Sequence, residues 1–252
     1  MTEPLSELFS DPTYSEFLSG ITEELSESSY LPVILQASST HERNRAREHF
    51  ERRSFDAVID VSPYKGSELL EVLRELSVPT VLCGQLEGHP YRDVFSTVYS
   101  DDEEGGHFAA LAMKERGRKD IVAVLGPQDN PAVIDRLRGY RAVLDKDLPD
   151  ENVVYTGWNS GDGYQAMHQL LAREINFDGV LCGSDRIAAG VITALNEAGL
   201  SVPSDVSVVG FDDHEIAARC VPALTTVRQP LREEGHMAAN IALDMIKGAE
   251  PT

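Results

Sequence analysis

Long apolar runs are missing from this 252-residue sequence, and no stretch of 18 apolar residues could form a membrane-spanning helix. The N-terminus, MTEPLSELFSDPTYSEF, is acidic and lacks the basic start and apolar core of a secretory signal peptide. We therefore expect a cytoplasmic protein without a membrane partner.

Cysteine and basic residues are both scarce. The three cysteines, Cys83, Cys182 and Cys220, are odd in number and far apart, and we expect Cys83 and Cys182 to be reduced core thiols. The 22 Lys and Arg against 42 Asp and Glu give a net charge of −20. Such a chain repels phosphate backbones, so any contact with DNA should come from a segment outside this sequence.

Motifs of enzymes are also missing. The sequence has no G-x-S-x-G elbow, P-loop, dinucleotide fingerprint or H-E-x-x-H pair. The run from Asp212 to Glu215 could suggest a metal site, but consecutive side chains point in different directions and rarely converge on one ion. We predict no enzyme activity, no metal and no cofactor.

Short β-branched runs alternate with helical periodicity along the chain. Strands are predicted at 31–35, 56–61, 79–83, 120–125, 152–156, 178–182 and 206–210. Most are apolar on both faces, as in parallel sheets covered by helices on both sides. Helices are predicted from Asp11-Pro12, with Asp11 as N-cap, and at 41–53, 67–76, 103–116, 132–144, 161–173, 185–198 and 231–247. This alternation predicts a doubly wound α/β fold.

The ends of the chain and one internal segment depart from this pattern. No apolar strand precedes the first helix and none follows Lys247, so we expect the sequence to be part of a longer polypeptide. Residues 84–100 lack a long periodic stretch and are a candidate crossing between two lobes.

Polar and aromatic residues follow several of the predicted strands. Arg136 comes after the 120–125 strand, Trp158 after 152–156, Ser184 and Asp185 after 178–182, and Asp212 after 206–210. Ligands of open α/β sheets bind beyond the carboxyl ends of the strands. Carboxylate and guanidinium groups suit vicinal hydroxyls, and an aromatic ring covers the apolar face of a sugar.

Each of these residues also fits a purely structural role. Ser184 or Asp185, and likewise Asp212 or Asp213, could cap the helix that follows. Arg136 alone fits a solvated helix charge, and a lone tryptophan fits a core position. Convergence of several strand ends is what favours a binding site.

Five blocks of sequence, in this order, resemble the effector-binding core of the lactose/galactose-repressor (LacI/GalR) family of transcription regulators. They are DPTYSEFLSGI, YSDDEEGGHFAALAMKERGRKDIVAVLG, RLRGYRAVL, FDGVLCGSDRIAAGVITALNEAGLSVPSDVSVVGFDD and PALTTVRQP. The resemblance implies a periplasmic-binding-protein-like fold of two lobes, each a mainly parallel, doubly wound sheet flanked by helices. The lobes would comprise residues 1–98 with 228–252, and residues 99–227, with crossovers near Tyr99 and Val227 and a third beyond the C-terminus.

The resemblance also implies roles for individual residues. Arg136 of RLRGY matches the family's ligand-clamping arginine, and Asp212 of GFDD its ligand carboxylate. Trp158 and Tyr14 fall where family members place aromatic walls, Tyr14 on the other lobe. Ser184 stands where the family often has asparagine, next to Asp185, and Gly84 where some members have a ligand-contacting acid.

The function implied is that of a sugar-responsive sensor domain. A mono- or disaccharide would bind between the lobes and, in a homodimer, change the spacing of DNA-binding heads absent from this sequence. Three alternatives remain: a purine or nucleoside sensor of the same fold, an extracytoplasmic sugar-binding protein of a transporter, and an α/β enzyme.

Overall fold

The chain folds into two compact units in the computed structural model, which describes residues 9–37, 39–61, 68–84, 91, 93–144, 148–173 and 175–250. Unit 1 comprises residues 1–100 and 230–252, and unit 2 comprises residues 101–229. The predicted lobe boundaries lie two residues earlier at each crossing. Among the described residues, no helix is long and apolar enough to span a bilayer.

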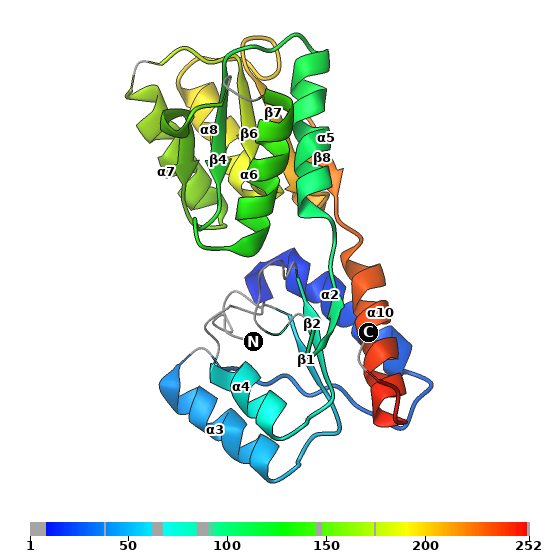
Figure 1. The fold of residues 1–252 in the computed structure, drawn as a ribbon. Helices are drawn as coiled ribbons and strands as arrows, with labels where there is room; N and C mark the ends of the chain where they lie inside the picture. The colour runs from blue at the N-terminus through cyan, green and yellow to red at the C-terminus, as the bar shows by residue number, and fades with distance from the viewer. Residues whose placement is uncertain are drawn as a thin grey trace. The chain divides into compact units, whose positions relative to one another are not determined.

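Unit 1 is built on a parallel sheet of three strands in the order β1-β2-β3. The strands are β1 (Val58–Asp60), β2 (Thr80–Cys83) and β3 (Ser96–Val98). Helices α2 (Pro12–Leu25) and α10 (Leu231–Ile246) pack on one face around Phe17 and Ile21. Helices α3 (Thr40–Glu51) and α4 (Glu68–Glu75) cover the other face through Phe50 and Leu73 (Figure 1).

Unit 2 is built on five parallel strands in the order β5-β4-β6-β7-β8. These strands are β4 (Ile121–Leu125), β5 (Val153–Tyr155), β6 (Gly179–Cys182), β7 (Ser207–Asp212) and β8 (Thr225–Arg228). The helices are α5 (Asp102–Glu115), α6 (Pro131–Leu144), α7 (Ser160–Leu171), α8 (Asp185–Glu197) and the short α9 (Glu215–Arg219), with a 3-10 turn η2 (Asp150–Asn152) before β5.

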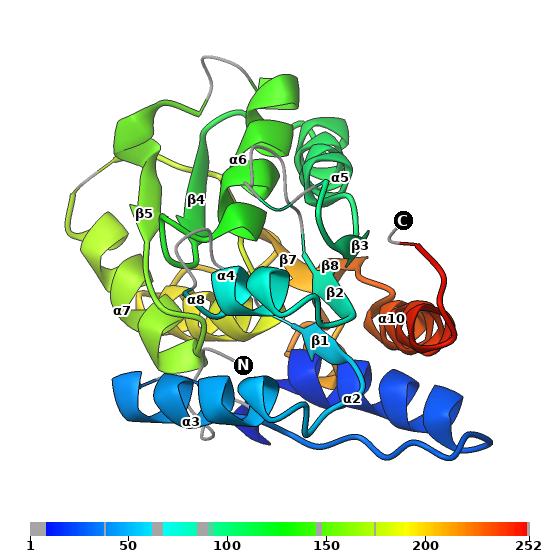
Figure 2. The same ribbon diagram turned by 60° about the horizontal axis from the view of Figure 1, so that its bottom comes forward.

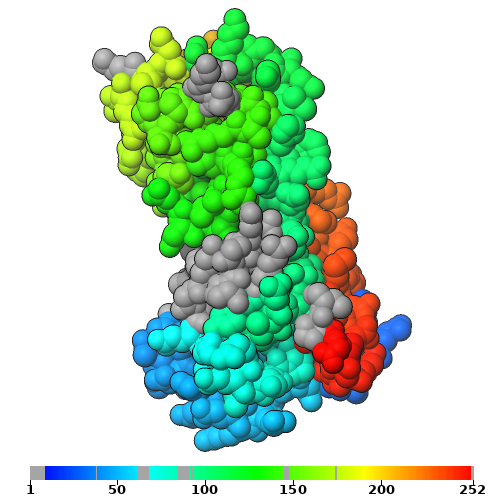
Figure 3. All heavy atoms as spheres, viewed as in Figure 1, coloured from blue at the N-terminus to red at the C-terminus, as the bar shows by residue number. Residues whose placement is uncertain are grey.

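Alternation along the central strands of unit 2 builds two cores. Ile121, Ala123 and Leu125 of β4 face α5 and α6, whereas Val122 and Val124 face α7 and α8. Figure 2 shows the two helix pairs on opposite sides of the sheet. The outer sides of α5 and α6 are solvent-exposed on the face drawn in Figure 3. This confirms the predicted parallel α/β architecture, with helices on both faces.

Most predicted elements are present, with ends shifted by at most two residues. Asp11 is the N-cap of α2, its side chain accepting a hydrogen bond from the Thr13 amide at 3.0 Å, as predicted. The cysteines are free thiols, with Cys83 and Cys182 buried. The sequence did not predict β3, β8, α9 or η2, which are all short; β3 lies inside the segment expected to be an irregular crossing.

The predicted strand Leu31–Leu35 is wrong. The structure has irregular backbone there, with Leu31 87% exposed and Val33 66% exposed. Pro32 lacks the amide that a ladder needs, and the described strands of the sheet are β1, β2 and β3 alone. An apolar run therefore does not by itself make a strand.

Candidate functional site

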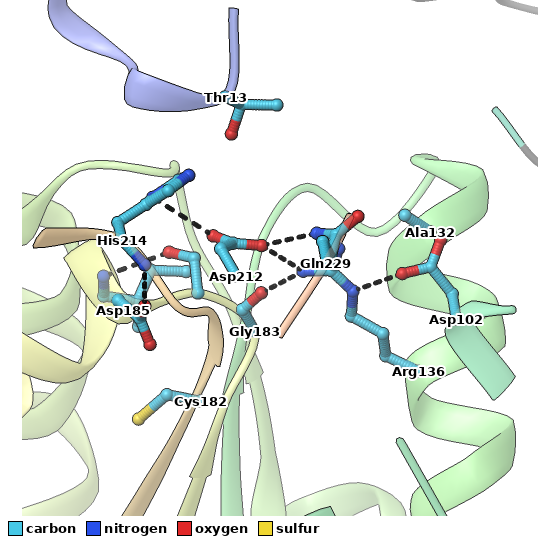
Figure 4. Close-up of polar contacts among 12 residues, drawn as sticks. Thr13, Asp102, Ala132, Arg136, Cys182, Gly183, Asp185, Asp212, His214 and Gln229 are labelled. Carbon is cyan, nitrogen blue, oxygen red and sulfur yellow. Dashed lines mark hydrogen bonds and ion pairs between the residues drawn. The ribbon is translucent and has the colours of Figure 1, made fainter. Parts of the chain in front are cut away.

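The centre of the candidate site is the guanidinium of Arg136, which is only 4% exposed. Its Nε donates to Asp102 Oδ1 at 2.8 Å, and Nη1 donates to the carbonyl oxygen of Gly183. Nη1 also lies 3.5 Å from Asp212 Oδ1 (Figure 4). A buried charge requires such partners, because its desolvation is otherwise prohibitive.

Sheet order brings these groups together. Gly183 follows β6, Asp212 ends β7 and Arg136 projects from α6, which follows β4. Because β4, β6 and β7 are neighbouring parallel strands, their carboxyl ends lie at one edge of the sheet. Asp102 begins α5, so the second carboxylate comes from the helix that packs beside α6.

Aromatic rings flank the guanidinium. The Arg136 Cζ atom lies 3.7 Å from the centroid of the Phe211 ring and 6.0 Å from that of Trp158. Burial disfavours the charged guanidinium, but the carboxylates of Asp102 and Asp212 outweigh that effect and raise the pKa of Arg136 above its ordinary value. Arg136 therefore carries its charge at every physiological pH.

Asp212 has partners besides Arg136. Its Oδ1 accepts from Gln229 Nε2 at 2.6 Å, and its Oδ2 lies 3.7 Å from His214 Nδ1. The residue is 7% exposed, and it neither caps α9 nor points into solvent. The cap role that the spacing also allowed for Asp212 and Asp213 is therefore wrong, since His214 occupies the N-cap position of α9.

Ser184 and Asp185 separate into two roles. Ser184 caps α8, its Oγ accepting from the Ile187 amide at 3.1 Å, which confirms the capping interpretation for this residue. Asp185 is fully buried. Its Oδ2 accepts from the His214 amide at 2.8 Å and its Oδ1 from Thr226 Oγ1 at 2.5 Å.

Trp158 lies over Gly126, the residue that directly follows β4. Its ring packs against both cores of unit 2. A Cβ atom built on Gly126 would come within 2.5 Å of the indole ring. Tyr14 lies in unit 1, half-buried in the first turns of α2. The structure thus gathers five of the six predicted residues in unit 2 and places the sixth in unit 1.

Sequence reasoning missed Asp102, Phe211, His214, Thr226 and Gln229. Asp102 stands in an acidic run at a predicted helix start, where acidic residues are common because they interact favourably with the helix dipole. Gln229 lies in the PALTTVRQP block, directly after β8. Because β8 was not predicted, Gln229 was not recognised as a residue at a strand end. A group of three His, Cys, Asp or Glu side chains able to hold a metal is not found among the described residues.

Comparison with known proteins identifies the family. Residues 110–252 match the model of the periplasmic binding protein-like domain. The HTH-type transcriptional regulator CelR of Thermobifida fusca is 32% identical over 251 residues, 98% of this chain and 74% of that protein. The chain belongs to the LacI/GalR family of transcription regulators.

Further relatives agree with this assignment. The ribose operon repressor of Escherichia coli K12 is 30% identical over 96% of this chain and 73% of its own length. The PurR repressor of Salmonella arizonae is 31% identical over 92% of the chain and 69% of its own length. The structure of a CelR–cellobiose complex superposes with a TM-score of 0.94 at 32% identity, covering all of this chain and 78% of that one. The chain is the effector-binding domain of a LacI-type transcription regulator.

Replacing Gly126 with alanine should displace the only tryptophan of the chain, because the added methyl group would overlap the indole ring of Trp158. We expect a shifted fluorescence emission maximum in Gly126→Ala. The control is Gly161→Ala in the first turn of α7, where the nearest atom to an added Cβ is the Asn159 side chain at 3.1 Å. Identical emission from both variants would contradict this packing.

Removing Asp102 should destabilise unit 2, because Arg136 would lose its shortest carboxylate partner while staying buried. We expect Asp102→Ala to lower the free energy of unfolding by about 3 kcal/mol in urea titrations. Glu103→Ala is the matched control, since Glu103 pairs with Arg138 on the half-exposed surface. Its removal should lower the free energy of unfolding by less than about 1 kcal/mol. Equal losses in the two variants would contradict the buried pair.

Asp185 should make stability depend on pH. Burial, assisted by the charge of Asp212, raises the pKa of Asp185 to about 6, above its unfolded value. The protonated form of Asp185 is thus favoured in the folded state. Its contribution to the free energy of unfolding is full below the unfolded pKa and is lost as pH rises through about 6. Between pH 4 and pH 7 the free energy of unfolding of the wild type should fall by on the order of 2 kcal/mol relative to that of Asp185→Asn, measured by urea unfolding at each pH. A constant difference between the two proteins would contradict the shift.

Proposed function

We propose that this domain senses a small sugar, and that Arg136 and Asp212 bind its hydroxyl groups. The observation that carries the proposal is the ion pair of a buried guanidinium and a buried carboxylate, 3.5 Å apart, at the carboxyl edge of a parallel sheet. Such a pair offers donors and acceptors side by side, which is the pattern that vicinal hydroxyls require.

The aromatic residues complete the proposed site. Trp158 would cover the apolar face of the sugar ring, and Tyr14 of unit 1 would contribute a second aromatic ring. Ser184 would offer its hydroxyl oxygen at the start of α8, and Asp185 would lie beneath it. The sugar-bound structure of CelR and the name of the ribose operon repressor support a saccharide as the effector.

In the full regulator, effector binding would favour one arrangement of the two units over another. We expect a homodimer in the cytoplasm, without enzyme activity, that contacts operator DNA through a helix-turn-helix head outside this sequence. A ligand can shift such an equilibrium only by its difference in affinity for the two states, typically 1–3 kcal/mol. Light scattering of the purified domain measures the oligomeric state.

A purine or nucleoside is the second candidate effector, because an aromatic wall also suits a base and PurR is among the relatives. The two candidates differ in their prediction for thermal unfolding. A true effector raises the melting temperature by mass action, so cellobiose or ribose should raise it, whereas guanine and adenosine should not.

Calorimetry with cellobiose and ribose tests the site. Asp212→Asn and Arg136→Lys should each weaken binding of the active sugar roughly 30-fold or more, because each removes a charge-assisted or bidentate contact. Arg138→Ala is the control, since Arg138 lies on the same helix but is half-exposed and pairs with Glu103 and Asp135, not with Asp212. Wild-type affinity in both site variants would overturn the proposed site.

A further inference from the structure

The loop that carries Asp212 adopts an unfavourable backbone. Asp212 has φ of 108° and Asp213 has φ of 62°, so two consecutive non-glycine residues lie at positive φ. Such conformations cost free energy and persist only where surrounding contacts fix them. Something must therefore hold this loop, and with it the carboxylate that we propose for effector binding.

The carboxylate of Asp185 holds the loop. Asp185, the first residue of α8, accepts the His214 amide on one oxygen and the Thr226 hydroxyl on the other, at 2.8 and 2.5 Å. His214 follows the two strained residues, and Thr226 lies on β8 beside β7. Asp185 thus joins the far end of the loop, through the His214 contact drawn in Figure 4, to the neighbouring strand β8, through Thr226.

The sequence of β7 leaves room for this arrangement. A Cβ atom at position 210 would lie 2.3 Å from Asp185 Oδ1, so only glycine lets the carboxylate lie across the strand. Ser184 already caps α8, so Asp185 is not needed for that task. Both Asp185 oxygens are committed to partners outside α8, from the loop and from β8.

From this geometry we infer that Asp185 is a positioning residue, which aims Asp212 at Arg136 by fixing the strained loop after β7. The inference rests on the proposed function for its consequence in effector binding, but the positioning itself can be measured without ligand. It gives Asp185 a role behind the site in place of direct contact with the effector.

Hydrogen exchange of the loop amides tests the positioning. In Asp185→Asn the amide oxygen can accept from His214 and the amide nitrogen can donate to Thr226 Oγ1, so exchange over residues 211–217 should stay within about twofold of wild type. Asp185→Leu keeps the branched shape of the side chain, with methyl groups in place of the two oxygens, but can make no hydrogen bonds. Its loop amides should exchange at least tenfold faster than those of the wild type. Residues 160–171 of α7 are the internal reference and should not change.

Each result of this experiment decides the inference. Wild-type exchange in Asp185→Leu, an equal increase in the loop and in α7, or loss of protection in Asp185→Asn would each overturn it. If Asp185→Leu does not fold, Thr226→Val decides, since it deletes one of the two hydrogen bonds and should still raise exchange selectively in the loop.

Binding of cellobiose separates positioning from general damage. Asp185→Leu should weaken the binding of cellobiose at least tenfold in the wild-type background. In the Asp212→Asn background it should weaken binding less than twofold, because the effect acts through Asp212. Equal losses in both backgrounds would overturn the coupling. If cellobiose does not bind the wild type, ribose takes its place in this measurement. If neither sugar binds, the proposed sugar effector fails, while the exchange measurement still decides the role of Asp185.

Discussion

The buried charge of Arg136 is the constraint on which the carboxyl edge of unit 2 depends. A guanidinium that is 4% exposed must be matched by acceptors, and the fold supplies them from three separate elements. Asp102 comes from α5, the Gly183 carbonyl from the end of β6, and Asp212 from the end of β7. The parallel order of the sheet is what brings them to one point.

A second layer of contacts lies behind that charge. The loop after β7 holds its unfavourable backbone beside Asp185, whose two oxygens bind the loop and β8. Gly210 has no side chain that would clash with the Asp185 carboxylate, and Gly126 has none that would clash with the Trp158 ring. The groups that we propose to meet the effector are thus oriented by residues that do not meet it.

Much of this arrangement could be predicted from the sequence, for identifiable reasons. Buried parallel strands such as β4 and β6 are apolar on both faces, and their ends placed Arg136, Ser184 and Asp212 near one edge. Asp11 followed by Pro12 marked the start of α2. Conversely, β8 reads as TTVR and is only partly buried, so its pattern resembles a loop, and Gln229 beyond it was missed.

Other features depend on packing that no local pattern contains. Asp102 is one acid in an acidic helix start, and only the contact between α5 and α6 shows that it meets Arg136. The Leu31–Leu35 run looked like a strand, but its backbone is irregular, because strand formation depends on tertiary context more than on apolar composition. Aspartate is enriched at positive φ, but nothing local in the sequence places Asp212 and Asp213 there together.

The nuclear magnetic resonance signal of the Arg136 Nε–H group gives the most direct test of the central claim. Its signal is assigned by its absence from Arg136→Lys and followed while cellobiose or ribose is added. If the buried guanidinium binds the effector, the signal should shift in proportion to saturation measured by calorimetry. A sugar that saturates the protein while this signal stays unchanged would contradict the account.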